Sequence, residues 1–297
     1  MGLFRIIDGF HTWSNSLIKN RFPLLSLYYY NKPRSYIYWR TQPVHKLLKG
    51  HLKPKSDKKS VIFFTVHKSA STFFDRYLKE LSKESGHIHI DLNGYFGTQW
   101  KKWLQMSQEP EFMKKISVKK GLMYGPLRNY IPFPDLKEYP VVLVLRDPRD
   151  VLTSQFFSIR NSHPLMTPEL IKRHKAAQTA TIDEHVLGQV DRFVNTYNAY
   201  LDNVYGKENV LFVKYETLIS DFKSCLETIN QHCGLGLNQE QLNTLDRTEK
   251  FKTKKEDQLS HVRKVSAGDH KDKLKPETIR ILNDRFGNIL KKLDYPL

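Results

Sequence analysis

Cysteine is scarce and long apolar runs are missing from this chain of 297 residues. Cys225 and Cys233 are its only cysteines, which excludes a disulfide framework, and without a second cysteine pair they do not form a zinc-site pattern. No stretch approaches the ~20 apolar residues of a membrane-spanning helix. No compact apolar region is followed by a small-residue cleavage site, so a secretory signal is not expected. We therefore expect a protein of a reducing compartment, the cytoplasm, with association at a membrane surface as the open alternative.

Acidic residues are also few relative to basic ones. The chain carries 48 lysines and arginines against 31 acids, which gives a net charge of +17. Residues 1–60 hold twelve of the basic residues and only two of the acids, among many tyrosines and tryptophans. We interpret residues 1–58 as a basic, aromatic N-terminal extension and residues 59–297 as the main domain. The extension is expected to pack on the main domain. Peripheral membrane contact through residues 1–50, or a nucleic-acid-binding arm, are the alternatives.

Residues 61–74 combine a strand pattern, a polar turn and a helix pattern. The β-forming run 61–66 stops at His67, and apolar residues recur at helical spacing from Phe73 onward. Such a turn directs backbone N–H groups and a helix N-terminus at one point, which suits an anion. The turn also supplies a cation and three hydroxyl groups, from Lys68, Ser69, Ser71 and Thr72.

This turn lacks the glycines of a nucleoside-triphosphate loop. The loop G-x-x-x-x-G-K-[ST] places its lysine near the end, whereas Lys68 precedes the hydroxyl residues here. The pattern therefore disfavours an atypical P-loop kinase. A plain strand followed by a Ser/Thr helix cap is the other interpretation of the segment taken alone.

A second apolar run, residues 141–145, has the pattern of a buried parallel strand and is followed by R-D-P-R-D. Arg146 would then lie at the carboxyl end of a strand, where open α/β sheets bind ligands. Ser154 follows eight residues later, about two turns into a helix that Pro148 would begin. Together they could hold a second phosphate, through a forked guanidinium contact and one hydroxyl hydrogen bond.

These two segments resemble the sulfotransferase family that uses 3′-phosphoadenosine 5′-phosphosulfate (PAPS). The family's 5′-phosphosulfate loop, P-K-[ST]-G-[ST]-[ST]-aromatic, is matched from Lys68 to Phe73, except that His67 replaces the usual proline and Ala70 the usual glycine. The family's 3′-phosphate motif, R-D-P-R-D-x-x-x-S, is matched without departure from Arg146 onward.

Two weaker similarities follow in the same order as in the family. Tyr215 and Glu216 look like the strand-end Y-E-D element whose tyrosine contacts adenine. Residues 263–271 resemble the C-terminal loop R-K-G-x-x-G-D-W-K, with Val265 and His270 off the pattern. The four elements span residues 61–271, which is most of the chain.

The resemblance implies a single α/β domain of the P-loop-like sulfotransferase fold, with a central, mostly parallel sheet flanked by helices. It implies transfer of a sulfuryl group from PAPS to a hydroxyl or amine of a small-molecule, lipid or glycan acceptor. The product 3′-phosphoadenosine 5′-phosphate (PAP) is released, and no metal is required. Lys68 would meet the negative charge that grows on the leaving phosphate oxygen. The implied donor contacts are Lys68, Ser69, Ala70, Ser71, Thr72 and Phe73 at the 5′ end, Arg146, Ser154, Arg263 and Lys264 at the 3′-phosphate, and Tyr215 at the adenine.

An acceptor hydroxyl also needs a general base. Residues 87–92 alternate strictly, so His87, His89 and Asp91 share one strand face. His89 or Asp91 could reach the cleft, as could His163 beyond the expected phosphate helix, although each could equally be an ordinary surface residue. His67 is expected to shape its loop rather than act as the base. The trio on the strand face could ligate a metal, but a half-exposed strand is the favoured interpretation.

The remaining pattern predicts strands separated by helices, hence a parallel, doubly wound sheet. Short strands are expected at 121–125 and 210–213, an irregular helical insertion at 97–120, and continuous helices at 179–205, 218–229 and 276–293. A basic, aromatic protein could instead bind nucleic acid through phosphate contacts and base stacking. Two ordered phosphate sites exceed what such binding needs, so no nucleic-acid partner is expected.

Overall fold

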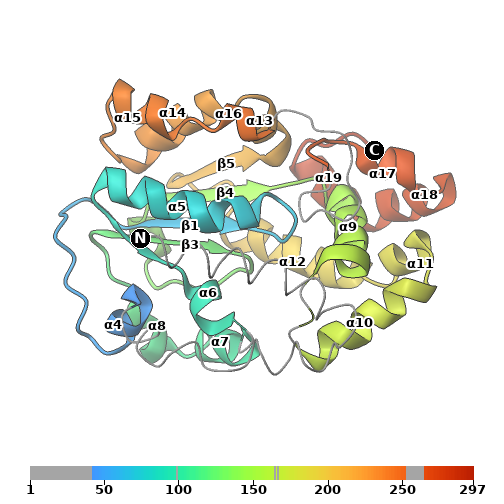
Figure 1. The fold of residues 1–297 in the computed structure, drawn as a ribbon, viewed down its shortest axis with the longest axis horizontal. Helices are drawn as coiled ribbons and strands as arrows, with labels where there is room; N and C mark the ends of the chain where they lie inside the picture. Colours follow the sequence, from blue (N-terminus) through green and yellow to red (C-terminus); the bar gives the residue numbers. More distant parts are fainter. Residues whose placement is uncertain (1–41, 98–99, 164, 166, 252–263) are drawn as a thin grey trace, which may run out of the picture.

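Five parallel strands form the central sheet, in the order β2–β3–β1–β4–β5 (Figure 1). The computed structural model describes residues 42–97, 100–163, 165, 167–251 and 264–297. All strand pairings are parallel, so the carboxyl ends of the strands meet at one edge of the sheet. The two phosphate motifs follow adjacent strands at that edge. The strands are β1 (Val61–Thr65), β2 (Ile88–Ile90), β3 (Leu122–Leu127), β4 (Val141–Leu145) and β5 (Val210–Lys214).

Both faces of the sheet are buried, which explains why its strands are continuous apolar runs in the sequence. In β1, Ile62 and Phe64 belong to one core cluster, and Val61 and Phe63 belong to the other. Helices α12 (Val190–Asn203) and α19 (Gly287–Lys292) contribute to the first cluster. Helices α5 (Ser71–Ser85) and α14 (Phe222–Cys233) contribute to the second. The predicted α/β fold with a parallel sheet between two layers of helices is confirmed (Figure 1).

Shorter helical segments complete the domain around this frame. No helix in the described ranges is long and apolar enough to cross a membrane. The segments are α4 (Pro43–Leu48), α6 (Leu92–Phe96), α7 (Trp100–Met106), α8 (Pro110–Ile116), the 3₁₀ turn η2 (Leu136–Glu138), α9 (Pro148–Phe157), the π-helix η3 (Ser158–Ser162), α10 (Pro168–Thr179), α11 (Ile182–Leu187), α13 (Tyr215–Ser220), α15 (Gln239–Leu245), α16 (Thr248–Phe251), α17 (Asp269–Lys273) and α18 (Pro276–Arg285).

The last part of the basic extension packs on the domain. Val44 and Leu47 of α4 are buried and belong to the same core cluster as Ile62 of the central strand. Lys58 then extends towards the opposite layer, where its ammonium group donates to the carbonyls of Ser85 and Leu235. Residues 1–41 lie outside the described residues, so membrane contact through residues 1–50 and a domain boundary at residue 58 stay predictions.

Each of the three helices predicted to be continuous is divided in two, so these predictions were wrong in detail. The region 179–205 forms α11 and α12, with a break at Gly188 and Gln189. The region 218–229 is crossed by the boundary between α13 and α14, where the Asp221 carboxylate accepts a hydrogen bond from the Ser224 amide at 3.2 Å and caps the second helix. The closing region 276–293 breaks at Phe286, between α18 and α19. The apolar periodicity of the sequence continues across each break because both helices of a pair pack against the same core cluster.

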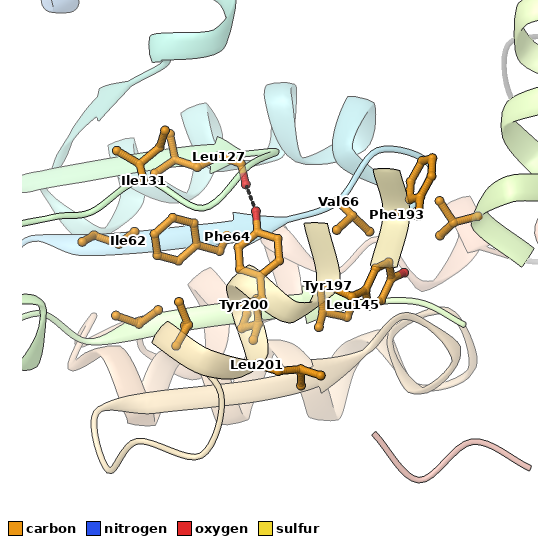
Figure 2. Packing of buried hydrophobic residues seen from close by; sticks show 14 of the residues in the cluster. Ile62, Phe64, Val66, Leu127, Ile131, Leu145, Phe193, Tyr197, Tyr200 and Leu201 are labelled. Atoms are coloured by element: carbon orange, nitrogen blue, oxygen red, sulfur yellow. Dashed lines mark hydrogen bonds between the residues drawn. The ribbon is translucent and has the colours of Figure 1, made fainter. Parts of the chain in front are cut away.

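A tyrosine on α12 fixes the ends of two central strands (Figure 2). The Tyr200 hydroxyl lies 2.7 Å from the carbonyl oxygen of Thr65 and 3.2 Å from that of Leu127. These two residues are the last of β1 and β3. The loops that begin at residues 66 and 128 therefore start from positions held by one buried hydrogen-bonding group.

Candidate active site

The loop between β1 and α5 adopts a glycine-like backbone without containing glycine. Lys68 and Ala70 have positive φ angles, 68° and 58°. Left-handed backbone costs a residue with a Cβ roughly 1–2 kcal/mol, so the surrounding structure must hold the loop in this form. Ala70 precedes the first residue of α5, and the Phe74 amide donates to the Ala70 carbonyl at 3.0 Å. The amides of the first turn of α5 therefore face the carboxyl edge of the sheet, as an anion site requires.

One guanidinium group joins the four motifs that the sequence analysis singled out. Arg146, which directly follows β4, donates to the Lys68 carbonyl at 3.1 Å and to the Ser266 carbonyl at 2.9 Å. Its Cζ lies 4.5 Å from the ring centroid of Tyr215. The β1 loop, the R-D-P-R-D segment, the strand-end tyrosine and the C-terminal loop are thus in direct contact at this residue.

Three buried polar atoms at this junction have no hydrogen-bond partner within the described residues. They are the Oγ of Ser69, the Nε of Arg146 and the Oγ of Ser266. Buried polar groups are nearly always paired, so an unpaired set at one place points to a ligand that supplies the missing acceptors. Two hydroxyls and a guanidinium N–H are suited to phosphoryl oxygens.

Asp150 fastens the C-terminal loop to the start of α9. Its fully buried carboxylate accepts hydrogen bonds from the Gly268 amide at 2.7 Å, the His270 amide at 2.9 Å and the His270 Nδ1 at 2.7 Å. Arg146 adds an ion pair at 3.4 Å. Burial alone would raise the pKa of Asp150, but the His270 hydrogen bond and the Arg146 charge lower it to about 2. Gly268 has φ of 79°, which favours glycine at this turn.

Two other charged residues of the R-D-P-R-D segment, Asp147 and Arg149, stabilise the fold through a helix cap and contacts with the C-terminal segment. The Asp147 carboxylate accepts from the Arg149 backbone amide at 2.9 Å and caps α9. The Arg149 guanidinium bonds that same carboxylate at 2.6 Å and reaches the carbonyl of Pro296 at 2.7 Å. Glu216, beside Tyr215, accepts from the Asp147 amide at 3.2 Å. Matching the whole segment to a phosphate motif did not reveal these roles.

The remaining donor contacts expected from the sequence differ in their surroundings. Ser154 is half-buried on α9, and Lys264 lies 3.2 Å from the Asp269 carboxylate. Ser71 is buried and Thr72 exposed at the start of α5, whereas Phe73 stacks on Tyr77 with ring centroids 5.0 Å apart. Arg263 lies outside the described residues.

The three candidate bases lie on different elements. His89, on β2, hydrogen-bonds the Gly125 carbonyl through Nε2 at 2.7 Å, and burial lowers its pKa. The Asp91 carboxylate caps α6 by accepting from the Gly94 amide at 2.7 Å. His163 follows the π-helix η3. In the described part of the chain no three His, Cys, Asp or Glu residues are grouped to hold a metal, and the His87 imidazole bonds Ser85 and Lys59 instead.

His67 lies among positive charges that the sequence did not place around it. Burial lowers the pKa of its imidazole well below the usual value, and Arg128, Arg192, His163 and Lys68 lower it further. The ring is therefore neutral at pH 7. His163 and Lys68, two residues that the sequence singled out, are thus both among the charges that act on this ring. The position of Arg128 directly after a buried strand was the signal available in the sequence.

A carboxyl group beside this region was also missed. Asp75, on α5, forms an ion pair with Arg128. Burial raises the pKa of Asp75 to about 6, although Arg128 opposes the shift and Asp91 adds to it. Asp91, which follows β2 and caps α6, is therefore one of the charges that act on Asp75.

The fold and this arrangement define a class: an α/β protein whose strand–loop–helix turn is suited to an anion. The profile of the sulfotransferase domain family matches residues 12–294. The chain therefore belongs to the sulfotransferase domain family.

Individual relatives are distant from this chain. A 3-alpha-hydroxysteroid sulfotransferase of Cavia porcellus and sulfotransferase 2A1 of Homo sapiens are each 28% identical over 127 residues, 41% of this chain. The match spans 40% of the length of these curated relatives. A mouse sulfotransferase complexed with PAP has a TM-score of 0.50 at 15% identity and covers 85% of this chain and 90% of that one. A retinol dehydratase in a complex with retinol and PAP has a TM-score of 0.50 at 16% identity, with 85% of each chain covered. Both structures share the fold.

Replacing Asp150 by asparagine should destabilise the protein in a pH-dependent way. The folded-state pKa of about 2 lies below the ordinary value of 3.8, so the stabilisation is complete above about pH 4 and is lost as the pH falls towards 2. We expect Asp150→Asn to lower the free energy of unfolding by roughly 3 kcal/mol at pH 7 and by much less near pH 3. Urea titrations at both pH values test this, with the exposed Asp202→Asn as control. An equal loss of unfolding free energy at the two pH values would contradict the low pKa of Asp150 in the folded protein.

Proposed function

We propose that the protein is a PAPS-dependent sulfotransferase. It moves the sulfuryl group of PAPS to a hydroxyl or amine of a small-molecule, lipid or glycan acceptor and releases PAP. The observation that carries this proposal is the junction at Arg146, where four motifs meet around three buried, unpartnered polar atoms. Membership of the sulfotransferase domain family and the shared fold with PAP-bound proteins support it.

The donor is proposed to lie along the carboxyl edge of the sheet. The 5′-phosphosulfate would face Lys68 and the hydroxyls and amides at the start of α5, which is the helix terminus suited to an anion. The 3′-phosphate would contact Arg146, Ser154, Lys264 and Arg263, with Tyr215 at the adenine. The position of Tyr215 against the Arg146 guanidinium supports this order, because both would touch the nucleoside half of the donor.

The reaction needs one bond to form and one to break in line. The acceptor oxygen forms a bond to sulfur while the bond between sulfur and the bridging phosphate oxygen breaks, and the electron pair stays on that phosphate oxygen. The Lys68 ammonium stabilises the charge that develops there, as an ion or by donating a proton. The proton of the acceptor hydroxyl passes to a general base.

His163 is the base we favour among the three candidates. The charges of His163 and Lys68 both lower the pKa of the His67 ring, which supports a position of His163 near the proposed point of transfer. The Asp91 carboxylate caps α6, and the Nε2 of His89 bonds the Gly125 carbonyl. The Nδ1 atom of His89 and the second oxygen of Asp91 keep both residues in consideration.

We also propose a cytoplasmic location. Cys225 and Cys233 are both free and buried, as expected in a reducing compartment. Burial raises the pKa of Cys225 to about 11, with a contribution from Asp221, and that of Cys233 to about 12, so both thiols are unreactive at neutral pH.

PAP should stabilise the full-length protein much more than ADP does. At about 100 times its dissociation constant, a ligand of the folded state adds about 2.7 kcal/mol to stability, and ADP lacks the 3′-phosphate that Arg146 and Ser154 would hold. Thermal shift with the two nucleotides measures this. Ser154→Ala should reduce the PAP shift and leave that of ADP unchanged, whereas the exposed Ser220→Ala should change neither. Equal shifts from PAP and ADP in the wild type would refute the 3′-phosphate site.

Lys68→Ala should lower the rate of transfer and leave the fold intact. Loss of one group that stabilises developing charge costs roughly 10²–10³-fold in rate. The measurement is incorporation of label from ³⁵S-PAPS into pooled acceptors at saturating PAPS, with the exposed Lys83→Ala as the charge-matched control on α5. A rate for Lys68→Ala close to that of Lys83→Ala would exclude the leaving-group role.

Alanine substitution of the general base should lower kcat by roughly 10²–10⁴-fold. We expect His163→Ala to have this effect and to abolish the acidic limb of the pH–rate profile. His89→Ala and Asp91→Ala should each lower the rate less, provided the PAP shift shows that the donor site is intact. Near-normal rates in all three variants would mean that the base lies elsewhere, and Asp75, with its pKa of about 6, would be the next residue to substitute.

A further inference from the structure

Two arginines lie near the proposed point of transfer but outside the four donor motifs. Arg173 is on α10, which is fastened to the π-helix η3. The His174 Nδ1 lies 2.9 Å from the Ile159 carbonyl, and the Gln178 amide donates to the Arg160 carbonyl at 2.7 Å. Interruptions of this π type are frequent at functional sites, and this one sets the position of α10.

Arg192 is held by the packing of the next residue in the chain. Phe193 of α12 is buried in the same core cluster as Val66 and Tyr197 (Figure 2). Val66 directly precedes His67, so the first turn of α12 and the start of the β1 loop belong to one packed cluster. Tyr200, two turns further along α12, bonds the carbonyls at the ends of β1 and β3. The start of α12 is therefore rigidly placed at the carboxyl edge of the sheet.

Within the described residues neither guanidinium group has a carboxylate partner, and the charge of Arg192 acts on Arg173. Burial lowers the pKa of Arg173, and the charge of Arg192 lowers it further. The Nη2 of Arg173 is buried with no hydrogen-bond partner, and the Nε of Arg128 is in the same condition. In the ranges that the structure describes, no hydrogen bond or ion pair joins Arg173 or Arg192 to an acid. His185 on α11 also faces this charge, and burial together with Arg173 lowers its pKa to about 4.

The positive charge extends to the residues that would surround the sulfuryl group. Arg128 and Arg192 both act on the imidazole of His67, which neighbours Lys68. Arg173 is half-buried and Arg192 is exposed, so the repulsion falls mainly on Arg173, and an anion bound there would compensate it. The phosphates of the donor are already assigned to the loop residues 68–73, Arg146, Ser154 and the C-terminal loop. The charge at Arg173 and Arg192 therefore calls for an anion that the donor phosphates do not supply.

We propose that the acceptor carries an oxyanion, such as a carboxylate, sulfate or phosphate, near the hydroxyl that is sulfated, and that Arg173 and Arg192 bind this group. The inference rests on the proposed sulfuryl transfer and narrows its substrate class to anionic acceptors. Forked guanidinium contacts with a planar or tetrahedral oxyanion would place the hydroxyl relative to the donor. An acceptor without the charge would leave the buried Nη2 of Arg173 without a partner.

The first test measures anion binding to the full-length protein saturated with PAP, so that the donor phosphate sites are filled. Sodium sulfate is titrated against sodium chloride at equal ionic strength, and the melting temperature is recorded. We expect sulfate to stabilise the wild type and Arg173→Gln/Arg192→Gln to lose the effect while keeping its response to PAP. Arg280→Gln/Lys291→Gln removes two exposed charges and should behave as the wild type. The proposal would be overturned if sulfate did not raise the melting temperature of the wild type, or if it raised that of the wild type and the double variant equally.

The second test uses paired acceptors with ³⁵S-PAPS. 4-Nitrophenyl β-glucuronide is compared with 4-nitrophenyl β-glucoside, and phosphatidylglycerol vesicles with diacylglycerol in phosphatidylcholine vesicles. The anionic member of a pair should be favoured at least tenfold in kcat/KM, and the double variant should lose roughly tenfold or more of that advantage. The first pair represents a water-soluble acceptor and the second a lipid headgroup. Transfer confined to neutral acceptors would contradict the inference.

The KM for PAPS separates acceptor recognition from an effect on the donor. It should stay within about twofold of the wild-type value in the double variant, because neither arginine is assigned to the donor. A large rise in the KM for PAPS with unchanged PAP binding would mean that the arginines hold the sulfuryl group instead. Failure of PAP to stabilise the wild type would refute the proposed function itself, and is a distinct result from loss of the anion response.

Discussion

The buried carboxylate of Asp150 is the constraint on which the donor side of this site depends. It binds two backbone amides and an imidazole of the C-terminal loop, and it also pairs with Arg146. A charge removed from water is stable only when most of its lone pairs are satisfied, and here four groups satisfy them. The arrangement fixes the distance between α9 and the C-terminal loop. Arg146, which pairs with Asp150, is thereby oriented towards the Lys68 carbonyl.

The second requirement is a loop that exposes helix amides to an anion without using glycine. Ala70 takes the left-handed conformation that the family pattern gives to glycine, and Lys68 takes it as well. The hydrogen bond from Arg146 to the Lys68 carbonyl is one interaction that maintains this backbone. The phosphate-binding shape therefore depends on a contact between two motifs. A single segment of sequence would not be expected to hold it alone, because the isolated loop would relax to a less strained conformation.

The sequence predicted the parts of the site that depend on local pattern. The strands 61–65 and 141–145 and the helix starts after them follow from apolar runs, polar turns and Pro148, and the family resemblance located Lys68 and Arg146. The helix breaks at Gln189, Asp221 and Phe286 were missed because the apolar period continues through them. The bond between Asp150 and His270 joins residues 120 positions apart, and His270 stood out only as a departure from the family pattern. Arg173 and Arg192 belong to no motif, so only packing could bring them together.

The two halves of the site differ in how their positive charge is balanced. On the donor side Arg146 pairs with Asp150 and Lys264 pairs with Asp269. These cations are neutralised before the ligand arrives, and their spare N–H groups can bind phosphate as hydrogen-bond donors in a fixed geometry. Arg173 and Arg192 have no such partner among the described residues, so their charge is left for a ligand to neutralise. A cation that already has a carboxylate partner can orient a ligand through its remaining N–H groups. A cation without such a partner selects for a negatively charged ligand, because a neutral ligand cannot compensate its charge. The acceptor side of this site is therefore where selection by charge should occur.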